Sequence, residues 1–155
     1  MRWTTFVVLQ IGIFLTASSQ ADAQLSKRDK QRIAVVLTAE INRAINERTE
    51  FGLREKVVRR MSECGLVFAI LSAQAKDGEP RARFRAMADI SVDVGSRISG
   101  TMSVDRFKQI ANLAKSAVDE MMKRRDEKET LLFLRNCKSF HEPNEIKDAV
   151  AELAY

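Results

Sequence analysis

The chain has 155 residues and a formal net charge of +5, from 26 lysines and arginines against 21 aspartates and glutamates. Its only tryptophan is Trp3 and its only tyrosine is Tyr155, so base stacking would rest on phenylalanine, and we expect no nucleic-acid partner. The sequence has no G-x-S-x-G, no phosphate-cradling glycine loop, no C-x-x-C and no C-x-x-C-H, which excludes the enzyme and cofactor classes that these motifs mark. We therefore expect no catalytic residue and no cofactor.

Residues 1–23 have the features of a signal peptide. Arg2 precedes an apolar run over residues 6–17, and Ala21-Asp22-Ala23 has the small-x-small pattern that signal peptidase accepts. The run of about 12 residues is shorter than the roughly 20 that a membrane-spanning helix needs. We expect cleavage and a periplasmic or secreted protein, with an uncleaved anchor as the alternative.

The mature chain, residues 24–155, has the length of a single domain, and its two cysteines are expected to form a disulfide. Exported proteins meet an oxidising environment, so Cys64 and Cys137 should pair. Closing this loop should stabilise the fold by about 4 kcal/mol on the chain-entropy model. The bond would place the middle of one helix beside the end of another. Redox catalysis is the alternative, which the absence of C-x-x-C disfavours.

Apolar residues recur at intervals of three and four along the mature chain, which predicts an all-α fold, a compact bundle of four to six helices. Ser26 should cap the first helix, with Asp29 in its first turn. The expected buried positions of the first two helices are Ile33, Val36, Leu37, Ile41, Ala44 and Ile45, then Leu53, Val57, Met61, Cys64, Phe68, Leu71 and Ala75.

Asp77-Gly78-Glu79-Pro80 should end the second helix and start the third, with Pro80 in its first turn. Gly100 should close the third helix, and the fourth should start at Ser103. Their expected buried positions are Phe84, Met87, Ser91, Val94 and Ile98, then Val104, Phe107, Ala111, Ala114, Val118 and Met121. Residues 123–129 have no apolar member, so residues 104–139 form either one long helix or two. Leu131, Leu132, Phe133, Leu134 and Cys137 should then be buried, and Pro143 should introduce a terminal helix that buries Ile146, Val150 and Leu153.

The excess positive charge lies early in the mature chain, since residues 27–60 contain ten Lys or Arg against five Asp or Glu. Glu40, Glu47, Glu50 and Glu55 interleave with these cations, which is typical of a salt-bridged surface. The alternative is a basic face that binds an anionic membrane surface or an acidic protein.

Three arginines, Arg81, Arg83 and Arg85, fall in the first turns of a predicted helix, where the helix dipole opposes positive charge. Asp77 and Glu79 can offset them locally. Arg81 and Arg85 lie four residues apart on one side of the helix, so we single them out as a possible contact for an anion or an acidic partner.

His141 follows Cys137 by four residues, the spacing of two metal ligands on one helical face. Glu142 and Glu145 would complete such a site poorly, and a thiolate is lost once Cys137 is oxidised. We therefore expect no metal.

The function that these features favour is binding, by an exported, non-catalytic protein whose partner is another envelope or secreted protein. A stress-responsive holdase chaperone is the second hypothesis, and an enzyme of unknown reaction is the third.

Overall fold

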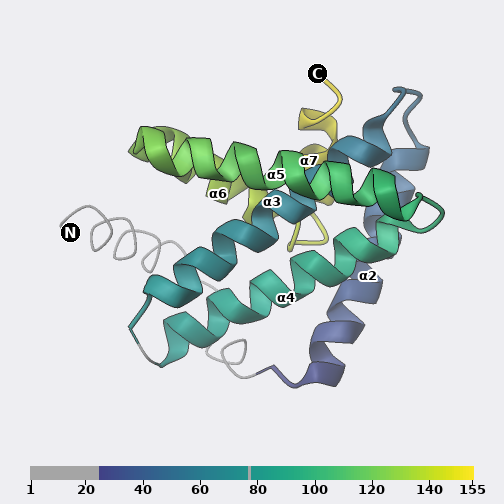
Figure 1. The fold of residues 1–155 in the computed structure, drawn as a ribbon. Helices are drawn as coiled ribbons and strands as arrows, with labels where there is room; N and C mark the ends of the chain where they lie inside the picture. Colours follow the sequence, from purple (N-terminus) through teal and green to yellow (C-terminus); the bar gives the residue numbers. More distant parts are fainter. Residues whose placement is uncertain (1–24, 77) are drawn as a thin grey trace.

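The computed structural model describes residues 25–76 and 78–155, and over those residues it contains six helices and no strand (Figure 1). The helices are α2 (Lys27–Asn46), α3 (Leu53–Gln74), α4 (Glu79–Ser99), α5 (Val104–Arg124), α6 (Glu127–Ser139) and α7 (Ile146–Glu152). The all-helical prediction is confirmed. The predicted signal peptide, residues 1–23, and Asp77 lie outside the described residues.

The antiparallel pair α3 and α4 forms the centre of the bundle, and two glycines let its backbones approach closely. A Cβ atom added to Gly65 would lie 3.1 Å from Cγ2 of Val92, and one added to Gly95 would lie 3.3 Å from Cβ of Met61. Such distances are tighter than ordinary van der Waals contact, so larger residues would push the helices apart.

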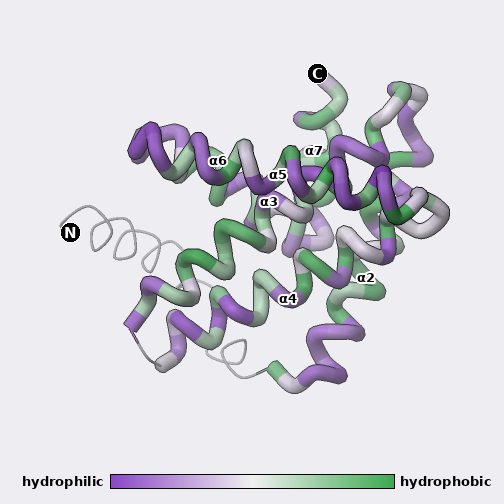
Figure 2. Tube along the Cα trace, viewed as in Figure 1, coloured by the Kyte–Doolittle hydropathy of each residue, from purple (hydrophilic) through white to green (hydrophobic). Residues whose placement is uncertain are grey.

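The other helices pack around this pair. α5 crosses it on one side, α2 packs against α4 and α7, and α6 contacts α3, α5 and α7 (Figure 1). Figure 2 shows hydrophobic residues along α3 and hydrophilic ones over much of α5, α6 and the first turns of α2. No helix among residues 25–76 and 78–155 is both long and apolar enough to cross a membrane.

Side chains cap three helices. Ser26 Oγ accepts a hydrogen bond from the Asp29 backbone N–H at 3.2 Å, as predicted, and Ser103 Oγ accepts one from the Arg106 N–H at 3.2 Å. Residues 104–139 form two helices, because Arg125, directly after α5, adopts the left-handed conformation (φ 53°) and Asp126 caps α6. The Asp126 carboxylate accepts from the Glu129 N–H at 3.0 Å.

The predicted buried face of α3 is confirmed at every position, whereas three other predictions of burial are wrong. Val36 is 52%, Val104 68% and Leu132 69% exposed. Val104 is the first residue of α5, whose buried residues begin only at Ile110. Leu132 lies two residues from the buried Thr130 and Leu134, on the opposite side of α6. Val36 faces a pocket described below.

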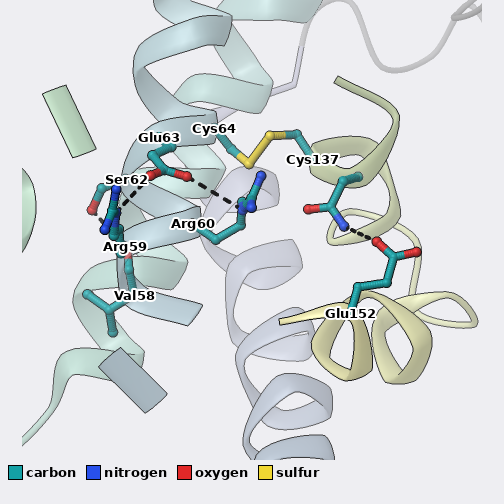
Figure 3. A network of polar contacts seen from close by, with 9 residues as sticks. Val58, Arg59, Arg60, Ser62, Glu63, Cys64, Cys137 and Glu152 are labelled. Carbon is teal, nitrogen blue, oxygen red and sulfur yellow. Dashed lines mark hydrogen bonds and ion pairs between the residues drawn. A yellow bond between two sulfur atoms is a disulfide. The ribbon is translucent and has the colours of Figure 1, made fainter. Parts of the chain in front are cut away.

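The buried side chains form two clusters. The large cluster joins α2, the first half of α3, the second half of α4 and α7, together with Ile110 and Phe140. The disulfide cluster joins the second half of α3, the first half of α4, the end of α5 and α6. The Cys64 and Cys137 sulfur atoms lie 2.03 Å apart with their Cα atoms at 5.5 Å, which confirms the predicted disulfide (Figure 3).

Charged residues border the disulfide (Figure 3). Glu63 is nearly buried and pairs with Arg59 at 2.9 Å and Arg60 at 3.5 Å. The Arg60 guanidinium also lies 4.9 Å from the centre of the Phe133 ring, a cation–π contact between α3 and α6. These contacts satisfy a carboxylate that would otherwise be costly to bury.

Candidate functional site

A pocket of about 470 Å³ opens between α2, α4 and the segment that joins α6 to α7. Its volume falls in the range of small-molecule sites, roughly 300–1,000 Å³. The pocket brings together three stretches of chain that are far apart in the sequence, around residues 25–37, 83–90 and 138–143.

Apolar side chains make up most of the pocket wall. They come from one face of α2, one face of α4 and the two flanking segments, and they are Leu25, Ile33, Val36, Leu37, Ala86, Met87, Ile90 and Pro143. Val36 is half exposed because it stands at the mouth of the pocket rather than in the core. The long, flexible side chain of Met87 can adapt to the shape of an apolar group.

The charged residues of the wall are mainly cations. Arg32 comes from α2, Arg83 from α4 and Lys138 from the last turn of α6, and Glu142 is the single carboxylate that the described part of the chain adds to the wall. Arg83 pairs with Glu79 at 3.0 Å. Within the described residues, neither Arg32 nor Lys138 takes part in an ion pair. The pocket therefore joins an apolar wall to positive charge that protein carboxylates leave available.

His141 lines the same pocket and ties it to the core. Its Nε2 shares a hydrogen bond of 2.9 Å with Ser91 Oγ, and its ring meets Phe68 edge-on with 5.7 Å between ring centres. Burial of the ring lowers the pKa of His141 to about 4. The imidazole is therefore neutral at pH 7, and this side of the pocket adds no charge.

The Ser91–His141 contact has the distance that joins a nucleophilic serine to its general base in some enzymes. Ser91 lies inside α4 with 0% of its surface exposed, so a substrate carbonyl cannot approach its hydroxyl. No carboxylate hydrogen-bonds to the His141 ring among the described residues, so an orienting third group is missing there. The contact is a packing interaction between α4 and the segment after α6.

The arginines singled out from the sequence do not gather in the pocket. Arg81 and Arg85 are exposed on α4, whereas Arg83, between them, lines the pocket on the other side of the helix. Sequence reasoning selected the pair with a helical spacing and missed Arg83, Arg32 and Lys138. The available signal for this side of α4 was its apolar residues: Met87 lies one helical turn after Arg83 and Ile90 lies two turns after it.

The glutamates of the basic segment, residues 27–60, form ion pairs. Glu40 pairs with Arg43, and Glu50 lies 3.9 Å from Arg48. Glu47 and Glu55 instead pair with distant cations, Lys147 at 3.0 Å and Arg106 at 2.5 Å.

The His141 and Cys137 side chains do not converge on a metal position, because the Cys137 sulfur is in the disulfide. Residues 25–76 and 78–155 contain no group of three or more His, Cys, Asp or Glu side chains that could hold a metal ion. Glu145 accepts a hydrogen bond from Ser139 Oγ at 2.7 Å, and Glu142 lines the pocket.

The chain matches none of the protein-family models, curated proteins or solved structures with which it was compared.

Proposed function

We propose that the protein is an exported, non-catalytic binding protein, and that the pocket between α2, α4 and the segment after α6 holds its partner. The observation that carries the proposal is the combination of an apolar wall with Arg32 and Lys138, two cations that no protein carboxylate neutralises within the described residues. A partner that presents an apolar group beside an anionic one would match both features.

The proposal assigns binding to one located site instead of to helix faces in general. An envelope or secreted protein and a small amphipathic molecule both carry apolar groups next to carboxylates. An anionic membrane surface fits less well, because a bilayer cannot enter a concave pocket of about 470 Å³.

A fluorescent probe with an aromatic body and a sulfonate, 1-anilinonaphthalene-8-sulfonate, tests the site. We expect saturable binding of one probe per chain to the folded, oxidised protein at pH 7. Val36→Trp should abolish it, because Val36 lines the pocket mouth. Val35→Trp is the matched control, since Val35 is equally exposed, at 51%, and does not line the pocket. Equal binding by both variants would disprove the location.

A holdase chaperone that responds to acid is the second candidate, and His141 is the observation that favours it. A neutral imidazole packed on Phe68 and Ser91 resists protonation until the surrounding contacts loosen, which would expose apolar surface. The test is aggregation of an acid-sensitive client at pH 3.5 and pH 7 with and without the protein. Protection only at the lower pH, lost in His141→Gln, would support this candidate, and equal client aggregation with and without the protein would rule it out.

A further inference from the structure

We infer that the pocket binds a single-chain alkyl carboxylate, with the carboxylate between Arg32 and Lys138 and the alkyl chain along the apolar faces of α2 and α4. The inference deepens the proposed function and rests on it, since it names the ligand class of the same pocket. It follows from the charge of the wall and the polarity of the lining.

The charge of the wall fits a single negative charge. Over residues 25–76 and 78–155, the wall sets Arg32, Arg83 and Lys138 against one carboxylate, Glu142, and a second carboxylate outside the wall, Glu79, pairs with Arg83. The residual charge is therefore small and positive. A carboxylate neutralises it, whereas a dianionic phosphate would exceed it.

Arg32 and Lys138 are suited to hold the carboxylate because they belong to different helices and are free of ion pairs within the described chain. A guanidinium presents two parallel N–H donors that match the two carboxylate oxygens, and a lysine ammonium adds a third donor. The Arg83 side chain is 12% exposed and paired with Glu79. It therefore adds to the positive electrostatic potential of the pocket without contacting the ligand carboxylate.

The remaining wall favours an alkyl chain over a peptide. A peptide segment would bring backbone N–H groups that each need an acceptor when buried. Among the described residues, the wall offers Glu142 as its only carboxylate and otherwise cations, a neutral His141 and apolar side chains such as Ile33 and Met87. An alkyl chain makes no such demand and gains free energy from every methylene that it buries.

The test is calorimetry on the purified, oxidised protein with hexanoate, octanoate and decanoate below their micelle concentrations, and with 1-decanol and decyltrimethylammonium. We expect one site per chain, with affinity rising up to about tenfold for each added pair of methylenes. Decanoate should bind at least about tenfold more tightly than the neutral alcohol, and the cation should not bind.

Matched variants locate the carboxylate. Arg32→Ala and Lys138→Ala should each weaken decanoate binding by about tenfold or more. Arg28→Ala is the control for Arg32→Ala, and Arg135→Ala is the control for Lys138→Ala. Each control residue is exposed, lies about one turn before the tested residue on the same helix and is outside the pocket wall. Their affinities should equal that of the unmodified protein.

The outcomes separate this inference from the proposed function. If the sulfonate probe binds at the Val36 site but decanoate does not displace it, the proposed function stands and the ligand class is wrong. Three other results would also overturn the ligand class. The first is equal affinity for decanoate and decanol, and the second is an equal loss of decanoate affinity in the two pocket variants and their two controls. The third is tighter binding of a peptide with an apolar C-terminal residue. Failure of both probe and decanoate to bind would overturn both.

Discussion

The large cluster and the disulfide cluster are held together in different ways. In the large cluster, α2 alone buries Ala34, Leu37, Ile41, Ala44 and Ile45, and α7 adds three more buried residues. In the disulfide cluster, α6 buries only Thr130, Leu134 and Cys137 of its 13 residues, a smaller share than the three of seven residues that α7 buries. Noncovalent packing is sufficient where many apolar side chains meet. The disulfide lies where α6 contributes few buried side chains, so the bond compensates for the limited apolar burial of that helix.

The largest effect should come from removing the disulfide. The bond joins residues separated by 73 positions, so the double variant Cys64→Ala/Cys137→Ala should lose about 4 kcal/mol of unfolding free energy on the chain-entropy model. Denaturant unfolding measures the loss. Native-state hydrogen exchange should show α6 losing protection before α2, because α6 has few other buried contacts.

Uniform loss of protection across both clusters would contradict the comparison, since it would mean that the bundle unfolds as one unit. A loss far below about 1 kcal/mol would show that α6 is held mainly by packing and by the Arg60–Phe133 contact.

Gly95→Val should have the next largest effect, because it acts at the seam that joins the clusters. A Cβ at this position already lies 3.3 Å from Met61 Cβ, and two further methyl groups would overpack the α3–α4 interface. We expect a loss of about 1–3 kcal/mol, measured by denaturant unfolding. Ser96→Val, which introduces the same side chain at an exposed position on the same helix outside the glycine contacts, should change stability much less. An equal loss in both would argue against close approach as the cause.

Acid should weaken the fold through His141. Its pKa is about 4 in the folded protein and 6.5 ordinarily, so the unfolded chain binds the proton more readily. Stability is therefore constant above pH 6.5 and falls as the pH drops toward 4. The expected loss between pH 7 and pH 5 is at most about 2 kcal/mol.

His141→Gln isolates this effect, since it cannot titrate but can still hydrogen-bond to Ser91. The pKa values of Glu47 and Glu55 are lowered from 4.5 by Lys147 and Arg106, so their stabilisation is lost only as the pH falls below about 4.5. Thermal unfolding at pH 7 and pH 5 measures the difference: the unmodified protein should lose more stability between these pH values than His141→Gln does. Parallel losses in both would assign the acid sensitivity to other groups.

The smallest effect should come from a helix cap. Asp126→Ala removes the acceptor of the Glu129 N–H and should cost about 1 kcal/mol. Ser103→Ala removes the same kind of bond from α5 and should cost a similar amount. Hydrogen exchange should show the Asp126 variant fraying mainly in α6. Fraying that spreads to α2 would contradict the separation of the clusters.

The elements that sequence reasoning predicted are those with local causes. The caps of Ser26 and Ser103 and the buried face of α3 follow from nearby residues, and the cysteine pairing was predicted from the expectation of an oxidising compartment. The break between α5 and α6 stayed undecided because a charged run suits either a solvated helix or a turn. The left-handed Arg125 and the Asp126 cap resolve it.

The pocket was beyond sequence reasoning because its charges come from three separate helices. Arg32, Arg83 and Lys138 share no spacing along the chain, and only the packing of α2 on α4 brings them together. The close α3–α4 approach was missed for a similar reason, since Gly65 and Gly95 acquire meaning only once each helix faces the other.

The glycine seam also sets one wall of the pocket. α4 supplies that wall, and it lies close against α3 where Gly65 and Gly95 bring the two backbones together. The placement of Arg83, Met87 and Ile90 in the wall therefore depends on two glycines that do not themselves line the pocket.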